Sequence, residues 1–527
     1  MNINWKKIII SIIIFIASII SYYYPIYSKG FAPGADFSNL AQARNFAVVG
    51  DYNYESEDGV FLSSDKLEQE AKATGMKNPL TSVIYGYIFK IFGYEGSGLL
   101  LPQYISIFLA AIFNVIIFLL IASIFNLTTG IFSSTLLILM PTRVMGAIYY
   151  SSYEFAMIFF AIALWFYFKS NDIFNKNNII RLIFASLFFS LAALSRNAFL
   201  ISFIPFAIYD LIKCRSFKRS LVFVIPFIII FGATLTPFSW LGVPNGYTTD
   251  MDQQPFAQIG HVFNDPYSAY YDRDNFINEF KDSKIERIGV HFLDKWGYEV
   301  SFWEKINAYK ESISYYIKDI FSLTSTGGPI ILFLVFLGIF KLFETRKDIL
   351  GLFVLWIAIW LISLVYYKTG NWNHLLEIIF IFATLTGLGV QWLIDHINLG
   401  SFKKYFFGAI LLLSILGHLS YANWWRLYDT YRSSHMGITL EISEKINEIE
   451  INGRVAVGIH TGVSYGVYYF TDKDIIYFNP NTIKKLIKEN KLKEAMELYD
   501  VGLIVGYSPE ISTIVEEGLG IPTIKIE

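Results

Sequence analysis

The stretch Leu99–Ile124, LLLPQYISIFLAAIFNVIIFLLIASI, contains no charged residue along its whole length. A helix needs about 20 mostly apolar residues to cross the hydrocarbon core of a bilayer. This stretch meets the requirement and predicts a transmembrane helix. Comparable apolar stretches occur on both sides of it, so the sequence predicts a membrane protein with many spans.

The composition of the whole chain agrees with a membrane protein. Of the 527 residues, 54% are hydrophobic and only 16% are charged, against about 25% charged in an ordinary soluble domain. The formal net charge of −2 argues against nucleic acid or another polyanion as a partner. The single cysteine, Cys214, excludes an intrachain disulfide framework and a cysteine-based metal cluster.

About eleven stretches are apolar and long enough to be interpreted as membrane spans. They are Ile8–Tyr27, Leu99–Ile124, Gly130–Tyr149, Phe155–Phe168, Ile179–Leu194, Ala198–Ile212, Leu221–Leu241, Pro329–Phe343, Leu350–Tyr366, Leu375–Leu393 and Tyr405–Tyr421. The first follows Lys6 and Lys7 and lacks a small-x-small cleavage site. It therefore resembles a retained signal anchor more than a cleaved signal peptide.

The lysines and arginines between the spans predict the orientation of the chain. With the N-terminus in the cytoplasm, these cations gather in the cytoplasmic loops, as the positive-inside bias requires. The basic loop residues are Lys169, Lys176, Arg181, Lys213, Arg215, Lys218, Arg219, Lys341, Arg346, Lys347, Lys403 and Lys404. We therefore predict a multi-pass protein of the cell membrane with a cytoplasmic N-terminus and an extracytoplasmic C-terminal domain.

The tail beyond the last span has a different texture, in which short apolar runs alternate with polar helical patterns. The predicted strands are Arg454–Ile459, Asp474–Phe478, Val501–Gly506 and Pro522–Ile526, and the predicted helices are Ile438–Ile449 and Thr482–Leu498. This alternation predicts a small α/β domain with a mainly parallel sheet. The predicted architecture is a polytopic α-helical membrane domain over residues 1–425, with outer loops 28–98 and 242–328, followed by an extracytoplasmic α/β domain over residues 426–527.

The first outer loop begins with the glycine- and proline-rich run Gly30–Asp36, which breaks the backbone just beyond the first span. Asp36 then opens a short helix whose spacing places Leu40, Ala43 and Ala47 on one face. Two interpretations of Asp36 are open. It is a helix N-cap that accepts backbone N–H groups, or it is a carboxylate that takes a proton from an acceptor.

Other polar residues stand out at the edges of the predicted spans. They are Arg44, Asp51, Lys77, Asn78, Glu154 and Arg196. Glu154 opens the fourth span, and Arg196 interrupts an otherwise apolar stretch. An arginine in hydrocarbon is costly, so Arg196 should face a polar cavity or a lipid phosphate, or should snorkel to the outer interface.

In this order, the segments resemble the GT-C glycosyltransferases, and in particular the protein O-mannosyltransferase-like and aminoarabinose-transferase-like branch of family 39. The motifs that carry the resemblance are Ala43-Arg44, Gly50-Asp51-Tyr52, Lys77-Asn78-Pro79-Leu80, Phe92-Gly93, Ser152-Tyr153-Glu154 and Leu194-Ser195-Arg196-Asn197. The resemblance covers residues 1–215 by motif and the remaining spans by architecture alone.

The resemblance implies an enzyme that moves a sugar, hexosyl or pentosyl, from a polyprenyl-phosphate carrier to a protein, lipid or glycan acceptor with inversion. Asp36 would be the general base. Counting back from Ala43-Arg44 places Ala35 where the family has aspartate and Asp36 where it has glutamate. A one-residue shift in the turn would instead make Asp36 the family's aspartate, and Asp36 is therefore the base by elimination. The family's tyrosine falls at Asn39 or Leu40, where that contact is absent or replaced.

The same resemblance implies which residues bind the substrate. Arg44, Lys77 and Arg196 would hold the carrier phosphate, and Asp51, Asn78 and Glu154 would contribute further contacts. His374 and Glu377, three residues apart at the outer end of the tenth span, would contact phosphate or sugar, bind a metal or simply cap the span. No cofactor is expected, and a divalent metal is left open.

Two alternatives follow from other features. The run Asn423–Asp429 faintly resembles the Trp-Trp-Asp-Tyr-Gly element of oligosaccharyltransferases, although it lies at the membrane exit and Arg426 stands where that element has aspartate. A transporter or flippase of lipid-linked sugars would instead show broken or charged helices near the bilayer midplane and often an internal repeat. Arg196 is the strongest such charge, and no repeat is visible.

Overall fold

The computed structural model describes the chain except for residues 1–4, 30–36, 54–55, 57–60, 71–77, 95–99, 150, 171–174, 197, 215–216, 235–301, 368–371, 397–400, 433–434, 459–460, 478–479, 489 and 525–527. The chain divides into two compact units. The first contains Met1–Gly30, Gln103–Ala233 and Glu286–Arg432, and the second contains Phe31–Pro102, Thr234–Ile285 and Ser433–Glu527. Most of the predicted second outer loop, residues 242–328, lies outside the described residues.

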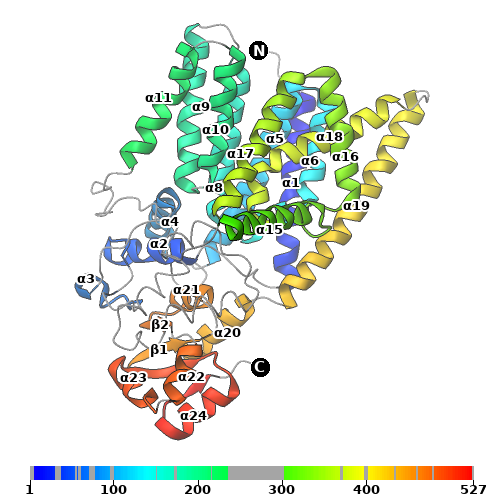
Figure 1. The fold of residues 1–527 in the computed structure, drawn as a ribbon. Helices are drawn as coiled ribbons and strands as arrows, with labels where there is room; N and C mark the ends of the chain where they lie inside the picture. Colours follow the sequence, from blue (N-terminus) through cyan, green and yellow to red (C-terminus); the bar gives the residue numbers. More distant parts are fainter. Residues whose placement is uncertain are drawn as a thin grey trace. The chain divides into compact units, whose positions relative to one another are not determined.

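The first unit is entirely helical in its described part, and most of its helices are long, apolar and run side by side (Figure 1). They are α1 (Trp5–Lys29), α5 (Leu101–Ile124), α6 (Leu127–Leu139), α7 (Pro141–Tyr149), α8 (Ser151–Lys169), α9 (Lys176–Ser195), α10 (Phe199–Cys214), α11 (Phe217–Thr234), α15 (Phe302–Phe321), α16 (Pro329–Thr345), α17 (Lys347–Tyr367), the 3₁₀ helix η4 (Trp372–Ile378), α18 (Ile379–His396) and α19 (Ser401–Arg432). Over its described residues, each predicted span falls on one of these helices or on an adjacent pair. In both views, α15 runs crosswise to the long helices of its unit.

Several of these helices satisfy the length and composition of a membrane span. Within the described part of the chain, five do so by themselves: Trp5–Pro25, Leu101–Ile124, Ser152–Lys169, Lys176–Ser195 and Leu375–His396. A sixth is added if the pair Leu127–Leu139 and Pro141–Ile148, bent by 61°, is one broken span. The chain is a multi-pass helical membrane protein.

The bend between α6 and α7 follows from the sequence. Pro141 has no N–H to continue the ladder of α6, and its ring suits the first turn of a new helix. Met140 consequently adopts an extended conformation, with φ −65° and ψ 124°. The sequence predicted one span over Gly130–Tyr149, and the structure divides this stretch into two helices at Pro141.

Three glycines allow the helices around α18 to approach closely. A Cβ added at Gly338 of α16 would lie 2.0 Å from the Leu385 carbonyl oxygen, and one at Gly389 would lie 2.0 Å from the Leu334 oxygen. A Cβ at Gly387, on α18, would lie 2.0 Å from a side-chain oxygen of α6. Small residues at such crossings are typical of helices that associate within membranes, where close backbone packing replaces the hydrophobic effect.

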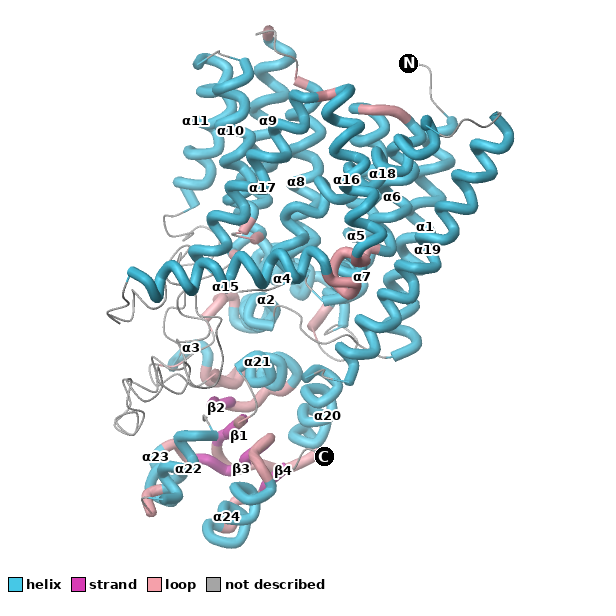
Figure 2. The backbone as a smooth tube through the Cα atoms, turned by 45° about the vertical axis from the view of Figure 1, so that its right-hand side comes forward, coloured by secondary structure: helices cyan, strands magenta, loops and turns pink. Residues whose placement is uncertain are grey.

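The second unit contains a four-stranded sheet with order β2-β1-β3-β4 and neighbours paired in parallel. Figure 2 shows the short strands flanked by helices. The elements of this unit are α2 (Phe37–Val49), α3 (Leu67–Glu70), α4 (Pro79–Phe92), α20 (His435–Asn447), β1 (Arg454–Val457), α21 (Thr461–Phe470), β2 (Ile475–Tyr477), α22 (Pro480–Lys488), α23 (Leu492–Leu498), β3 (Val501–Val505), α24 (Pro509–Leu519) and β4 (Thr523–Ile524). The sequence predicted these four strands and a mainly parallel sheet.

Two features of this unit differ from the sequence prediction. The helix expected over Thr482–Leu498 is two helices, α22 and α23, because Asn490 between them has a φ of 55°, and asparagine tolerates that left-handed conformation better than most residues. The first outer loop also belongs to the same unit as the tail. Phe61 forms an antiparallel bridge with Ile475 of β2, which extends the sheet with a residue from the other end of the sequence.

Candidate functional site

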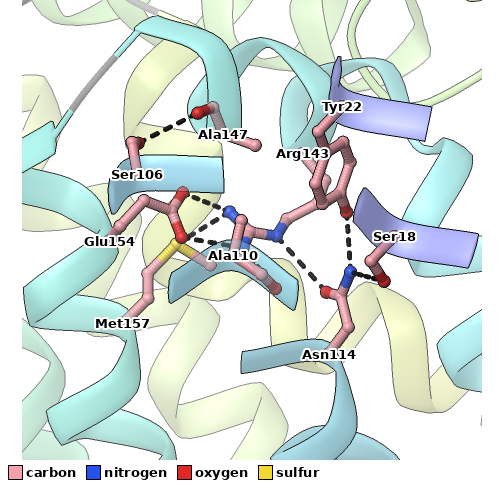
Figure 3. Close-up of polar contacts among 9 residues, drawn as sticks. All are labelled: Ser18, Tyr22, Ser106, Ala110, Asn114, Arg143, Ala147, Glu154 and Met157. Carbon is pink, nitrogen blue, oxygen red and sulfur yellow. Dashed lines mark hydrogen bonds and ion pairs between the residues drawn. The ribbon is translucent and has the colours of Figure 1, made fainter. Parts of the chain in front are cut away.

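The acid that opens α8, Glu154, is fully buried and forms an ion pair with Arg143 of α7 (Figure 3). Arg143 Nη1 lies 2.5 Å from Glu154 Oε1, and Nη2 lies 2.8 Å from Oε2. Two parallel N–H···O contacts are the bidentate geometry that suits guanidinium and carboxylate groups. The resemblance implied a substrate contact for Glu154. In the structure, both of its carboxylate oxygens accept hydrogen bonds from Arg143.

Further polar groups surround Arg143 and connect it to two more helices (Figure 3). Its Nε donates to Asn114 Oδ1 at 3.4 Å, and its Nη2 donates to the Ala110 carbonyl at 3.2 Å. The Asn114 amide donates in turn to the hydroxyls of Tyr22, at 2.7 Å, and Ser18, at 3.0 Å. The network therefore joins α1, α5, α7 and α8 inside the first unit.

Sequence reasoning missed Arg143. The sequence nevertheless contains a sign of its importance, because Arg143 is the one charged residue within the predicted span Gly130–Tyr149. Ionisable residues in transmembrane segments almost always face the protein interior and pair with a partner. The break at Pro141 and the acid eleven residues after Arg143 would together have indicated the pair.

The short helix α7 that carries Arg143 is anchored near both of its ends. The backbone N–H and the hydroxyl of Thr142 both donate to the Ser325 carbonyl, at 2.9 and 2.6 Å. At the other end, the Ser106 hydroxyl donates to the carbonyl of Ala147 at 2.9 Å. These bonds satisfy backbone groups that a broken helix leaves open, and they fix the direction in which Arg143 points.

Arg196 follows the last residue of α9, and its backbone N–H caps that helix by donating to the Ala192 carbonyl at 2.9 Å. Its guanidinium lies 4.5 Å from the centre of the Tyr153 ring, within the range of a cation–π contact. Tyr153 is the residue before Glu154. The structure therefore brings two of the sequence motifs together, Ser152-Tyr153-Glu154 and Leu194-Ser195-Arg196.

Glu377 lies in the 3₁₀ helix η4 and is fully buried. The next residue back, Leu376, packs on Gly146 of α7, where an added Cβ would lie 2.8 Å from Leu376 Cδ1. Glu377 is thus on an element that packs against the helix carrying Arg143. His374 lies on the same 3₁₀ helix, and the structure describes its backbone but not its side chain.

In the second unit, Arg44 of α2 is buried, and protein carbonyls engage its guanidinium. Nη1 donates to the carbonyls of Tyr468, Tyr469 and Thr471, at 2.7, 3.1 and 3.0 Å. These carbonyls lie at the C-terminal end of α21, where a cation interacts favourably with the helix dipole. The resemblance implied a phosphate contact for Arg44, whereas the structure gives it the role of a helix cap.

Two more candidates from the first outer loop lie next to the helices α2 and α4. The carboxylate of Asp51 accepts the backbone N–H of Tyr52 at 2.6 Å and the amide of Asn53 at 2.7 Å, a turn directly after α2. Asn78 is buried at the N-cap position of α4, before Pro79. Asp36 and Lys77 lie outside the described residues, so their predicted roles stay predictions.

The two tyrosines beside Arg44 stay neutral at ordinary pH. Burial raises the pKa of both the Tyr468 and the Tyr469 phenol, although the Arg44 cation opposes this rise. The Tyr468 hydroxyl can therefore donate to the Leu62 carbonyl at 2.8 Å while it accepts the Asn45 amide at 2.9 Å.

The described residues contain no cluster of three or more His, Cys, Asp or Glu side chains that could hold a metal ion.

A bundle of apolar helices with a buried arginine–glutamate pair, and a second unit with a small parallel sheet, define a polytopic membrane protein with an appended α/β domain. No protein-family model matches the chain. No curated protein matches it by sequence either. Solved structures, by contrast, match it over nearly its whole length.

Two of these structures are of oligosaccharyltransferases from Archaeoglobus fulgidus, and a third is of ArnT from Cupriavidus metallidurans. The archaeal oligosaccharyltransferase AglB from Archaeoglobus fulgidus, in complex with an inhibitory peptide and a dolichol-phosphate, aligns with a TM-score of 0.59 and 10% identity over 95% of this chain and 69% of its own. The apo form of the Archaeoglobus fulgidus oligosaccharyltransferase gives 0.57 and 11% over 94% and 69%. ArnT from Cupriavidus metallidurans bound to undecaprenyl phosphate gives 0.51 and 11% over 97% and 89%.

These matched structures belong to the GT-C superfamily of glycosyltransferases. At such low identity the likeness concerns the fold, and this chain has the GT-C fold. The fold expected from the six motifs is therefore confirmed.

Proposed function

We propose that the chain is a membrane glycosyltransferase that moves a sugar from a polyprenyl-phosphate carrier to a protein, lipid or glycan acceptor on the outer face of the cell membrane. One observation carries this proposal. The fold matches, over 95% and 97% of the chain, structures that hold a dolichol-phosphate and undecaprenyl phosphate. A carrier whose lipid stays in the bilayer is within reach of an enzyme embedded in the membrane, which agrees with the apolar helices of the first unit.

In the proposed reaction, the acceptor hydroxyl or amine attacks the anomeric carbon of the sugar. The bond from that carbon to the carrier phosphate oxygen breaks, and a bond to the acceptor forms. Asp36 takes the acceptor proton as general base, and the polyprenyl phosphate leaves with the electron pair of the broken bond. A single displacement of this kind inverts the anomeric centre.

Cations are needed where negative charge develops on the leaving phosphate. Arg196 is the best-supported candidate among the described residues, because it lies at a helix end, is only partly buried and is oriented by Tyr153. Lys77 and His374 are proposed as further contacts, as the resemblance implies. Glu154 is proposed to act through Arg143, whose contacts join α1, α5, α7 and α8.

The orientation of the chain is also a proposal, and Cys214 can test it. This only cysteine is the last residue of α10, beside a loop that the positive-inside bias places in the cytoplasm. A membrane-impermeant maleimide added to intact cells should leave Cys214 unlabelled and should label it once the cells are permeabilised. Labelling in intact cells, with a cytoplasmic marker protein unlabelled, would reverse the proposed orientation.

The proposed activity can be tested with purified protein in lipid nanodiscs. Supplied with a polyprenyl-phosphate monosaccharide and an extract of acceptors, the wild-type protein should release polyprenyl phosphate and form a new glycosidic product visible by mass spectrometry. Movement of the lipid-linked sugar between leaflets without release of the phosphate would instead identify a flippase.

The likeness to AglB favours a second candidate, an oligosaccharyltransferase-like enzyme, because that archaeal enzyme gives the higher TM-score. The two candidates differ in the donor. Such an enzyme should transfer a lipid-linked oligosaccharide as one block, whereas the favoured enzyme should transfer a single sugar. Product masses from the same assay, with the two donors offered in turn, separate them.

A further inference from the structure

The helix that follows the proposed base is packed on the C-terminal α/β domain. Phe37, the first residue of α2, lies against Tyr469 and Phe470 of α21, with ring centroids 5.8 and 5.6 Å apart. Gly466 makes this approach possible, because an added Cβ would lie 3.1 Å from Phe37 Cε2 and 2.6 Å from Thr439 Cγ2. The start of α2 is therefore held by the tail of the same chain.

The C-terminal half of α2 is held by polar contacts with the same helix. Arg44 caps the C-terminal end of α21 through three carbonyls and lies 4.6 Å from the Tyr468 ring. Asn45 donates to the Tyr468 hydroxyl at 2.9 Å and to the Asn53 carbonyl at 2.8 Å. Since α2 has 13 residues and is ~20 Å long, contacts in both halves restrain its rotation as well as its position.

A second attachment lies further along the first outer loop. Phe61 exchanges backbone hydrogen bonds with Ile475 of β2, at 2.8 and 2.9 Å. Asp474 accepts the N–H and the hydroxyl of Ser63, both at 2.8 Å, and the Lys66 ammonium at 2.6 Å. The Tyr468 hydroxyl links the two attachments, because it also donates to the Leu62 carbonyl.

We propose that the C-terminal α/β domain positions the helix that follows Asp36, with Arg44 and Tyr468 as positioning residues for the transfer reaction. Asp36 directly precedes Phe37 in the chain, so the placement of α2 limits where that carboxylate can lie. The inference rests on the proposed function, in which Asp36 is the base. It assigns the tail a part in catalysis that requires no contact with donor or acceptor.

The test compares full-length variants in nanodiscs by kinetics and by hydrogen exchange of the α2 backbone. Tyr468→Phe deletes one oxygen and with it the hydrogen bonds to the Asn45 amide and the Leu62 carbonyl. It should lower kcat at least about tenfold, since small misplacements of reacting groups have large effects on rate, and should change KM for the lipid-linked donor less than about twofold, since uniform substrate binding is untouched. Exchange within Phe37–Val49 should rise in the same variant.

Arg44 supplies a second, graded variant. Arg44→Lys keeps a cation at the end of α21 and should retain more of the wild-type kcat than Arg44→Ala. Lys493→Ala, on the exposed face of α23, is the matched control and should leave both kcat and exchange at wild-type values. This series remains informative if Arg44→Ala fails to fold, because Tyr468→Phe and Arg44→Lys are conservative.

Two results would overturn the positioning role. An unchanged kcat in Tyr468→Phe despite faster exchange in α2 would show that the placement of α2 does not matter for catalysis. A raised KM for the lipid-linked donor in Arg44→Ala, with unchanged hydrogen exchange in α2, would show that Arg44 binds the carrier phosphate directly. If the wild-type protein shows no transfer at all, the proposed function fails, and unchanged exchange in Tyr468→Phe would separately refute the attachment of α2 to the tail.

Discussion

Each of the two units buries an arginine, and the two arginines are satisfied in different ways. Arg143, among the apolar helices, is paired with the carboxylate of Glu154. Arg44, in the α/β unit, is engaged by the carbonyls that end α21. Inside an apolar bundle, a buried arginine needs a partner with a full negative charge, because the apolar surroundings do not solvate the cation. At the C-terminal end of a helix, the unpaired carbonyls already carry partial negative charge that can stabilise an arginine.

The largest effect is expected from breaking the pair in the bundle. Glu154→Ala leaves Arg143 buried without its carboxylate, which should destabilise the first unit by about 3–5 kcal/mol. Thermal unfolding in detergent, followed by intrinsic fluorescence, measures the loss.

The double variant Arg143→Met/Glu154→Leu removes both charges and should be markedly more stable than the single variant. Equal destabilisation by the single and double variants would show that packing volume, and not the charge pair, is what matters at this position. Arg219 and Asp210, a second buried pair in the same unit, offer an independent repeat of the comparison.

A smaller effect is expected from Arg44. Arg44→Ala leaves buried carbonyls without their donor, which should destabilise the second unit by about 1–3 kcal/mol. Limited proteolysis of the full-length protein, read by the rate of cleavage within the tail, measures this change. Cleavage at the wild-type rate would mean that water replaces the guanidinium without loss and that the cap contributes little.

The smallest effect concerns pH. Burial would raise the pKa of Asp474, but hydrogen bonds from Lys66 and Ser63 outweigh it and hold this pKa below its ordinary value of 3.8. A carboxylate with a lowered folded-state pKa contributes stability that is fully present above the unfolded-state pKa and is lost as the pH falls through the folded-state value. The effect is small because the Lys66 side chain is 42% exposed.

Pepsin cleavage at a series of pH values below about 5 can measure it. The wild-type tail should become more labile, relative to Asp474→Asn at the same pH, as the carboxylate is protonated. Parallel curves for the two proteins would remove Asp474 from the acid response.

The sequence predicted the elements well and their partners poorly. Hydrophobic periodicity located the apolar helices and the four strands of the sheet, because those signals are local. It could not show that Arg44 contacts residues 424 to 427 positions away, because such contacts depend on how distant parts of the chain fold together. Arg143 was missed because Gly130–Tyr149 was interpreted as one uninterrupted span, although Pro141 ends the first helix there.

The proposed transfer reaction depends most directly on Asp36. The decisive measurement is the turnover of a polyprenyl-phosphate monosaccharide by the wild-type protein and by Asp36→Asn, with binding of the same donor measured in parallel. If Asp36 is the base, Asn at this position abolishes release of polyprenyl phosphate while donor binding stays at the wild-type level. Turnover at the wild-type rate in Asp36→Asn would contradict the assignment of Asp36.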